Sequence, residues 1–185
     1  LASDLSRWAA FSHRWRRGPA SLPAGATPQQ ADAELESAVA GLLRGQLAPL
    51  LLGGDHSVTG GIIQAIAGEH ALLTGGRKAA FLHFDAHTDA YEKVPHFLGA
   101  IKSAAHWASF LVRQEQIDAN SSVQIGIRGN PRTLDWLAPS TELGYEVITM
   151  ERYRSLGVSE TIKIILDRIG DAPLYITFDL DCMDP

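Results

Sequence analysis

Three short segments of the sequence carry side chains that can hold metal ions. One places two glycines before Asp55 and His56, the second runs from His83 to Asp89, and the third starts at Asp179. Together they offer two imidazoles and four carboxylates as candidate ligands: His56, Asp85, His87, Asp89, Asp179 and Asp181. Carboxylates gathered at one place raise one another's pKa, so a bound divalent cation is the simplest explanation for so many acids. We therefore predict a metal site.

This ligand set is larger than one tetrahedral zinc ion takes. Two ions that share bridging carboxylates would use the whole set and leave room for a bridging solvent molecule. Oxygen donors combined with imidazole favour manganese over a metal that prefers thiolates. Cys182 lies between two acids, but the alternation of an extended chain points it away from Asp181, so we expect a buried thiol and not a ligand.

Short apolar runs alternate with helical patterns along the chain, and these elements must position the ligands. We predict strands at 47–52, 79–84, 123–127, 145–149 and 174–178. We predict helices at 27–44, with Thr27 as N-cap, and near 57–69, 102–117 and 158–169. Strands that alternate with helices form a parallel sheet covered on both faces. The expected fold class is therefore α/β, a single three-layer α/β/α domain with a mainly parallel sheet.

The carboxyl ends of the strands in such a sheet are where ligands bind. Each of the three candidate segments directly follows a predicted strand, so the fold would bring them together. A spacing of two residues puts His83, Asp85 and His87 on one side if the chain stays extended. By the same argument Asp179 and Asp181 share a face.

Composition and charge exclude several other classes of protein. The 185 residues are 45% hydrophobic and 20% charged, which is typical of a globular domain and not of a disordered chain. A net charge of −5 argues against binding to a nucleic acid backbone. No apolar run approaches the ~20 residues of a membrane helix, and the single cysteine can form no internal disulfide. We expect a soluble, cytoplasmic protein with neither nucleic acid nor membrane as partner.

The segments GGDHS at 53–57, HFDAHTD at 83–89 and FDLDCMDP at 178–185 resemble, in order and approximate spacing, the three metal-binding signatures of the ureohydrolase (arginase/agmatinase) family. IGIRG at 125–129 is similar to the agmatinase branch. The resemblance implies an α/β/α enzyme with a binuclear manganese centre. Such an enzyme cleaves a guanidino compound, here agmatine or a guanidinobutyrate-like molecule, to urea and an amine.

The resemblance also implies a role for each ligand. One manganese ion would be held by His56 and Asp89, the other by His87 and Asp181, with Asp85 and Asp179 bridging the pair. The two cations would lower the pKa of a bridging water, and the resulting hydroxide would attack the guanidinium carbon. Asp89 would orient this nucleophile as well as ligate, which makes it a candidate catalytic residue.

The family expectation of a proton-shuttling histidine after the second signature leads to His106 as the candidate general acid and base. His96 is a weaker alternative. The neighbouring Trp107 stands where relatives have a small residue, so we expect it to narrow the site and contact substrate. Glu92, in the loop 90–101, would attract a cationic amine, whereas Lys93 in the same loop would attract a carboxylate. The sequence does not choose between these two substrate types.

The resemblance also implies a division of the chain. We expect residues 1–26 to form an N-terminal arm, and 27–185 to form a ureohydrolase-like catalytic domain truncated at its C-terminal end. Homo-oligomerisation to a trimer or hexamer is a further family expectation. Two alternatives remain open: a non-catalytic member of this fold that binds metal or a polyamine, and a deacetylase-like hydrolase with a single metal ion.

Overall fold

The structure is a computed structural model of the whole chain. It describes residues 27–44, 50–53, 55–67, 74–92, 103–129 and 134–183. The predicted arm at 1–26 lies outside these ranges, as do Lys93 and His96. No described helix is long and apolar enough to cross a membrane.

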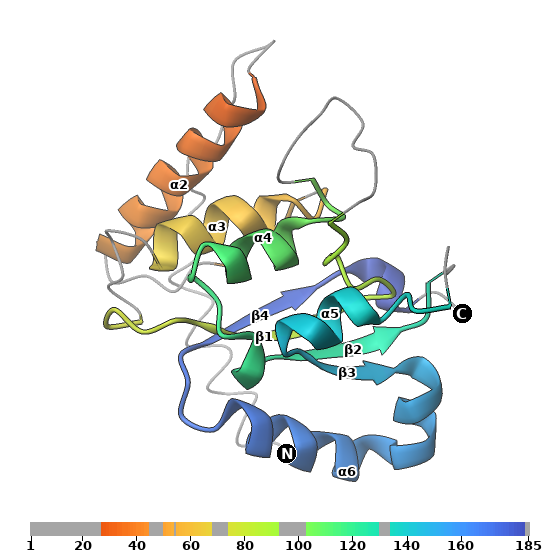
Figure 1. Cartoon of the computed structure of the whole chain (residues 1–185). Helices are drawn as coiled ribbons and strands as arrows, with labels where there is room; N and C mark the ends of the chain where they lie inside the picture. Colours follow the sequence, from red (N-terminus) through yellow and green to blue (C-terminus); the bar gives the residue numbers. More distant parts are fainter. Residues whose placement is uncertain are drawn as a thin grey trace, which may run out of the picture.

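Four parallel strands form the sheet at the centre of the structure (Figure 1). They are β1 Ala80–Phe84, β2 Val123–Ile127, β3 Glu146–Thr149 and β4 Leu174–Phe178. The strand order is β3-β2-β1-β4, so β1 lies between β2 and β4. Since parallel strands need long crossover connections, helices separate most of them along the chain. The predicted strands 79–84, 123–127, 145–149 and 174–178 are confirmed to within one residue.

Helices cover both faces of the sheet. The helices on one face are α2 Pro28–Arg44, α3 Val58–Ala67, α4 Trp107–Arg113 and α5 Ala138–Leu143, and α6 Met150–Ile169 lies on the other (Figure 1). Two apolar cores fill the spaces between these layers. Phe81 and Trp107 belong to the core on the α3 and α4 side, whereas Leu82 and Ile148 belong to the core under α6. The predicted α/β class is confirmed, with three layers.

Helix α6 is longer than the predicted helix 158–169. Thr149 caps its first turn by accepting a hydrogen bond from the backbone N–H of Arg152, 3.2 Å away. The chain then bends at Gly157, whose φ of 72° interrupts the helical backbone. Because this angle is left-handed, glycine is the residue that adopts it at least cost. The helix ends at Ile169, and Gly170 follows as its C-cap.

Two other predictions of secondary structure are wrong in part, and one helix was not predicted. Residues 50–52 of the predicted strand 47–52 form no regular structure, and 47–49 lie outside the described residues. Leu52 is 92% exposed, and an apolar run becomes a strand only where a neighbouring strand pairs with its backbone. The predicted helix 102–117 shortens to α4. Helix α5 was not predicted, because six residues that include Pro139 are too few to show a helical period.

In the sheet formed by the described residues, β4 is an edge strand, and one of its faces is apolar and partly exposed. Leu174, Ile176 and Phe178 are each about half exposed, while the alternate residue Thr177 is buried. Helix α6 packs mainly against β2 and β3 and does not extend over this face. An apolar surface therefore remains open beside α6.

Candidate metal centre

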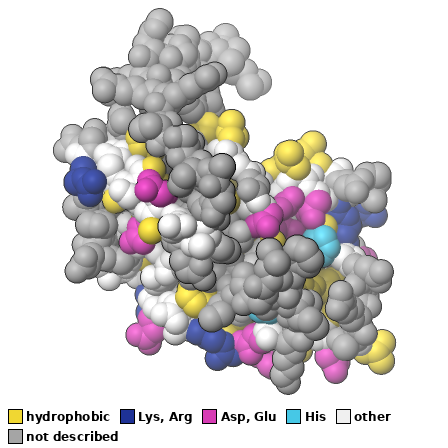
Figure 2. Space-filling view, turned by 90° about the horizontal axis from the view of Figure 1, so that it is seen from above, with side chains coloured by type: hydrophobic (Ala, Val, Ile, Leu, Met, Phe, Trp, Pro, Cys, Tyr) yellow, Lys and Arg dark blue, Asp and Glu magenta, His cyan; other side chains and the backbone are white. Residues whose placement is uncertain are grey.

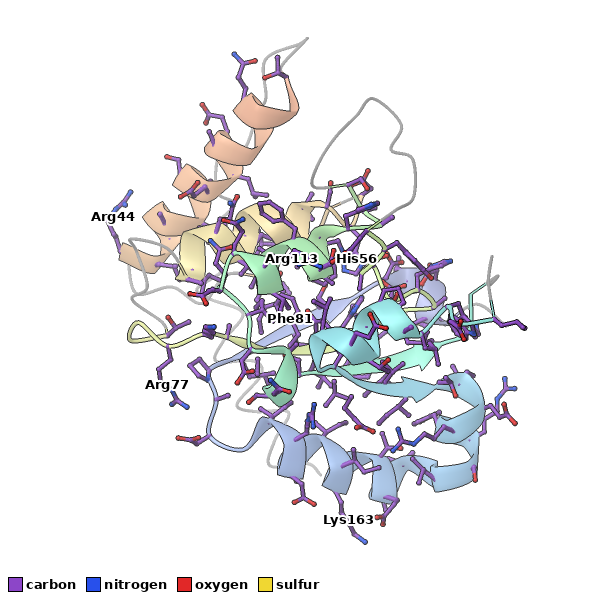
Figure 3. The ribbon with its side chains drawn as sticks, viewed as in Figure 1. Arg44, His56, Arg77, Phe81, Arg113 and Lys163 are labelled. Atoms are coloured by element: carbon purple, nitrogen blue, oxygen red, sulfur yellow. The ribbon has the colours of Figure 1, made fainter. Side chains whose placement is uncertain are left out.

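The candidate ligands gather where β1 and β4 end beside the start of α3. Phe84 and Phe178 pair at the ends of these neighbouring strands, so Asp85 and Asp179 leave the sheet side by side. The backbone N–H of Asp179 donates to the carbonyl of Phe84 at 2.8 Å, which fixes this arrangement. His56 lies just before α3, on the opposite side of the sheet from Lys163 of α6 (Figure 3).

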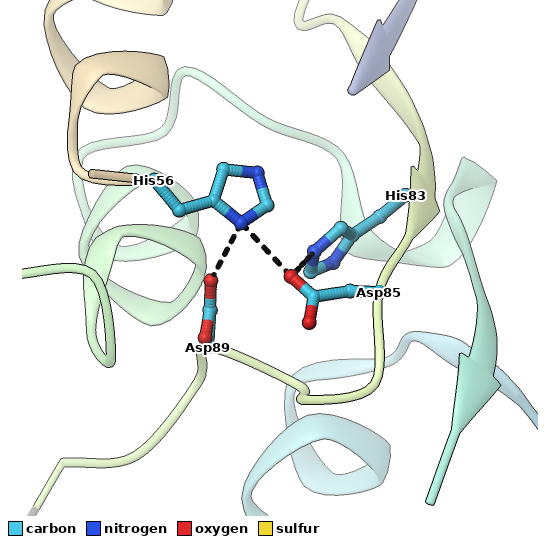
Figure 4. Close-up of side chains that lie close together, drawn as sticks. All are labelled: His56, His83, Asp85 and Asp89. Atoms are coloured by element: carbon cyan, nitrogen blue, oxygen red, sulfur yellow. Dashed lines mark hydrogen bonds and ion pairs between the residues drawn. The ribbon is translucent and has the colours of Figure 1, made fainter. Parts of the chain in front are cut away.

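His56 is at the centre of the first group of ligands (Figure 4). Its Nδ1 atom lies 2.8 Å from Oδ2 of Asp85, 3.0 Å from Oδ2 of Asp89 and 3.4 Å from Oδ2 of Asp179. Its other ring nitrogen, Nε2, is 2.8 Å from Oγ1 of Thr177. Among the described residues, no group makes a well-aligned hydrogen bond with the buried Nδ1 atom. A ring nitrogen that faces several carboxylate oxygens can give up its proton and ligate, so these residues fit a divalent cation.

His87 and Asp181 form the second group together with Asp85. Nδ1 of His87 lies 2.9 Å from Oδ2 of Asp181 and 3.5 Å from Oδ1 of Asp85. Asp85 thus turns one carboxylate oxygen toward each group, as a bridging ligand must. The ligand atoms within each group all lie within 4.8 Å of one another, which is close enough for one cation.

Asp179 has a different position from the other carboxylates. Its Oδ2 atom is the most distant of the three from His56, and its Oδ1 accepts a hydrogen bond from the backbone N–H of Asp181 at 3.0 Å. Asp179 therefore contacts the side chain of His56 in the first group, but only the backbone N–H of Asp181 in the second.

The charges in this cluster shift one another's pKa values. Burial opposes the charged form of His56, but contacts with Asp85 and Asp89 outweigh it and raise the pKa of His56 to about 10. Contact with Asp85, and then Asp181, raises the pKa of His87 to about 9. Burial alone would raise the pKa of Asp85, yet the surrounding histidines hold it well below its usual range. The carboxylates therefore attract positive charge strongly.

Asp89 differs from Asp85 in this respect. Burial is the largest influence on its carboxyl group and raises its pKa, and the nearby charge of Asp85 acts in the same direction. Asp89 also has a φ of 48°, a left-handed backbone that an aspartate adopts only at some cost. Backbone strain of this kind is common at functional sites.

Turns, and not an extended chain, bring the ligands together. Strand β1 ends at Phe84, and the backbone N–H of His87 then donates to Oδ1 of Asp85 at 2.6 Å. Residues Leu180–Met183 form a short 3₁₀ helix, so the expected alternation of Asp179 and Asp181 along a strand is wrong. The side chain of Asp181 is held by the backbone N–H of Ala86 at 2.9 Å.

The loop after β2 holds the short 3₁₀ helix Leu180–Met183 in place. The guanidinium of Arg128 donates to the backbone carbonyls of Asp181 and Cys182, at 2.6 and 3.2 Å. A Cβ atom on Gly129 would lie 2.9 Å from Cδ2 of His87, so only glycine leaves room for the imidazole there. Cys182 is half-buried, and burial together with the charge of Asp181 raises the pKa of its thiol.

The three predicted residues outside the ligand set occupy different surroundings. His106 is buried just before α4, where its Nδ1 is 3.2 Å from Oγ of Ser103. Trp107 is fully buried, and its indole N–H donates to Oδ2 of Asp89 at 2.7 Å. Glu92 is exposed and accepts hydrogen bonds from the guanidinium of Arg113.

Two residues of the centre were not predicted as part of it. His83 is fully buried on β1, and its Nε2 lies 2.8 Å from Oδ2 of Asp85 (Figure 4). Gln124 of β2 places its Nε2 atom 3.1 Å from Nδ1 of His83. The available signal was a polar residue inside an otherwise apolar strand, VQIGI at 123–127.

The surface of the molecule matches this description of the site. Figure 2 shows acidic side chains next to a histidine on the face that is seen from above. The side chain of His87 is 49% exposed and that of Asp181 is 37% exposed, so the second group opens to solvent. The first group lies deeper, since His56 and Asp85 are almost completely covered.

Comparisons with known proteins agree with this geometry. The family model described as the Arginase family matches residues 15–185. Proclavaminate amidinohydrolase of Streptomyces clavuligerus is 35% identical over 152 residues, which cover 81% of this chain and 45% of that protein. Agmatinase of Neisseria meningitidis serogroup C (strain 053442) is 36% identical over 138 residues, which cover 74% of this chain and 38% of that protein.

A solved structure gives the same result for the fold. The structure of proclavaminate amidino hydrolase from Streptomyces clavuligerus superposes with a TM-score of 0.71 at 31% identity, covering 87% of this chain and 50% of that one. The chain thus spans half or less of the length of these relatives.

Proposed function

Because this chain belongs to the arginase family, we propose that it forms the metal-binding part of a manganese-dependent amidinohydrolase. The reaction would cleave a linear guanidino compound to urea and an amine. The observation that carries this proposal is the position of Asp85, whose two carboxylate oxygens face two separate groups of ligands. A single-metal hydrolase needs only one such group.

The donor set supports manganese as the metal. Both groups consist of carboxylate oxygens and imidazole nitrogens, the combination that suits this ion. His56 and Asp89 would hold one ion and His87 and Asp181 the other, with Asp85 and Asp179 bridging the pair. Two bound cations would supply a water molecule of lowered pKa, able to act as a nucleophile at neutral pH.

Residues of the chain itself would orient the nucleophile and move protons. The indole N–H of Trp107 donates to Oδ2 of Asp89, which fixes the orientation of this carboxylate beside His56. In this orientation Asp89 would direct the attacking water. His106 immediately precedes Trp107 and would protonate the departing amine as general acid. The backbone N–H of Ala108 donates to the carbonyl of Asp89 at 3.1 Å, which ties the start of α4 to the metal centre.

Agmatine and guanidinobutyrate-like molecules are the first substrates to test. Glu92 would attract the far amino group of a cationic substrate, which requires its ion pair with Arg113 to open. Trp107 was expected to contact substrate, but its side chain is fully buried, so we propose that it influences substrate indirectly, through its hydrogen bond to Asp89. We further propose a cytoplasmic protein that assembles as a homo-oligomer, a trimer or a hexamer, and takes a small guanidino molecule as its partner.

The experiment is a urea-release assay on the chain with added manganese. The panel contains agmatine, guanidinobutyrate, guanidinopropionate and arginine, and the metal content of the protein is measured in parallel. We expect two manganese ions per chain and urea from at least one guanidino substrate. Two bound ions without urea from any substrate would instead indicate a non-catalytic metal-binding member of the fold. One tightly held zinc ion would point to the deacetylase-like alternative.

A matched pair of variants tests the role of Asp179 in this activity. Asp179→Asn should lose metal and turnover together, because the amide lacks the negative charge that the proposed bridging role of Asp179 requires. Asp171→Asn makes the same chemical change at an exposed position paired with Arg77, and should behave as the unaltered chain does. Full activity of Asp179→Asn would exclude a bridging role.

A further inference from the structure

We propose that His83 and Gln124 form a hydrogen-bonded pair that fixes the orientation of the shared carboxylate of Asp85. His83 is then a positioning residue and not a metal ligand. It could be mistaken for a ligand, because a ring nitrogen of His83 and ligand atoms of His56, Asp85 and Asp89 all lie within 4.8 Å of one another. The inference deepens the proposed function, since it rests on Asp85 being the ligand common to both groups.

The evidence is a buried chain of polar contacts that runs from β2 to the metal centre. Nε2 of Gln124 donates to the backbone carbonyl of Thr88 at 2.7 Å and lies 3.1 Å from Nδ1 of His83. Nε2 of His83 lies 2.8 Å from Oδ2 of Asp85. His83 and Gln124 are both 0% exposed and Asp85 is 1% exposed, so water cannot substitute for these partners.

The chemistry of these groups fixes which atom carries the proton. A carbonyl oxygen only accepts, so the end of Gln124 that contacts Thr88 is its amide nitrogen and not its oxygen. This nitrogen has two hydrogens, and the second one points to Nδ1 of His83. Nδ1 must accept that hydrogen with its lone pair. The ring proton of His83 therefore sits on Nε2, which donates to Asp85.

This arrangement determines how Asp85 can serve two ions. An Nε2 atom that carries a proton has no lone pair for a metal, so His83 cannot ligate while Gln124 holds its other nitrogen. The hydrogen bond from His83 fixes the rotation of the carboxylate, and the backbone N–H of His87 holds its other oxygen at 2.6 Å. Both carboxylate oxygens of Asp85 are thus held in fixed orientations without a bound cation. Partners of this kind commonly change metal affinity when they are lost.

The first test needs no substitution. In protein labelled with ¹⁵N-histidine and prepared without metal, the two ring nitrogens of His83 are distinguished by their chemical shifts and their couplings to ring protons. We expect a protonated Nε2 and an unprotonated Nδ1. A proton on Nδ1, or an even mixture of the two tautomers, overturns the proposal. Because this signal does not depend on turnover, it stands even if no substrate yields urea.

The second test separates a positioning role from a ligand role. His83→Leu removes the donor and should weaken manganese binding by about 10- to 100-fold in calorimetry. His83→Gln places an amide N–H near the position of Nε2 and should restore most of that affinity. Unchanged affinity in His83→Leu excludes the positioning role, and His83→Gln no better than His83→Leu indicates that the imidazole itself is needed as a ligand.

The third test addresses Gln124. Gln124→Leu should release the tautomer of His83, seen as mixed ¹⁵N signals, and should weaken manganese binding less than His83→Leu does. Gln116→Leu is the matched control, because Gln116 lies before the bridge between Ala79 and Ile117, at the other end of β1. A single unprotonated-Nδ1 signal in Gln124→Leu would show that Gln124 does not set the tautomer.

Discussion

Asp85 is the side chain that the two groups of candidate ligands have in common. Its carboxylate receives contacts from three imidazoles, those of His56, His83 and His87, and it is 1% exposed. The two carboxylate oxygens share one negative charge and face different ligand groups, so loss of this charge would affect both proposed metal positions. No other carboxylate among the described residues belongs to both ligand groups.

Asp85→Asn should therefore abolish retention of both ions. We expect manganese affinity to fall by at least about 100-fold at both positions, since the change is larger than the loss of a supporting hydrogen bond. Metal content after dialysis measures the result. Retention of one ion at normal affinity would show that the two groups do not share Asp85.

Metal binding should depend on pH because the ligand histidines hold protons tightly when no cation is bound. With His56 at a pKa of about 10 and His87 at about 9, both rings are charged at neutral pH, and each must lose a proton to ligate. Manganese affinity should rise as the pH increases from 6.5 toward 9. Calorimetry in buffers of different ionisation enthalpy should report proton release on binding. An affinity independent of pH in this interval would contradict the assigned ligands.

The ends of the strands and the loops after them build the candidate site. Strand β2 contributes through the loop that follows it, where Gly129 lies against the ring of His87. Gly126 has a φ of 95°, and its Cβ position would meet the backbone carbonyl of Asp85 at 3.1 Å. The two glycines thus leave the space that the second ligand group occupies.

Gly129→Ala should disturb only one half of the metal centre. The added methyl group would lie 2.9 Å from Cδ2 of His87, and this imidazole is exposed enough to swing away. We expect a Tm within about 4 °C of the unaltered chain, because a surface change costs little stability. One manganese ion should remain after dialysis instead of two. A chain that keeps both ions would show that His87 does not need this space.

The elements were largely predictable from the sequence, whereas the supporting contacts were not. Apolar runs identify β1 to β4, and the acids and histidines that follow the strands identify the candidate ligands that the fold brings together. The pairing of His83 with Gln124 depends on the register between β1 and β2, in which these two residues are partners. A register is set by packing across the whole sheet, so local spacing does not reveal it.

Strand β4 and helix α6 both carry exposed apolar side chains. Ile162 and Leu166 of α6 are exposed, as are Ile176 and Phe178 of β4. Arg168 donates to the carbonyl of Gly144, just before β3, so that flank of α6 faces β3. Helical periodicity then puts Ile162 and Leu166 on the flank toward β4. Exposed apolar residues that gather on one face commonly mark a site of association.

The chain of 185 residues should therefore self-associate as its concentration rises. Ile176→Lys places a charge in the middle of the apolar face and should shift the species seen by light scattering toward the monomer. Leu134→Lys is the control, because Leu134 is equally apolar and fully exposed but lies outside this face. If both variants associate like the unaltered chain, the face does not drive assembly.

The placement of Trp107 has an optical consequence. Its ring centroid is 4.8 Å from that of His56, and its indole N–H ends on Asp89, so a paramagnetic ion held by these two residues would quench its emission. Manganese should dim the intrinsic fluorescence of the chain, and Trp107→Phe should remove most of that change although three other tryptophans remain. A quench of equal size in Trp107→Phe would place the ion elsewhere. If manganese binds there, the emission of Trp107 would report how much of the proposed site is filled, without an added dye.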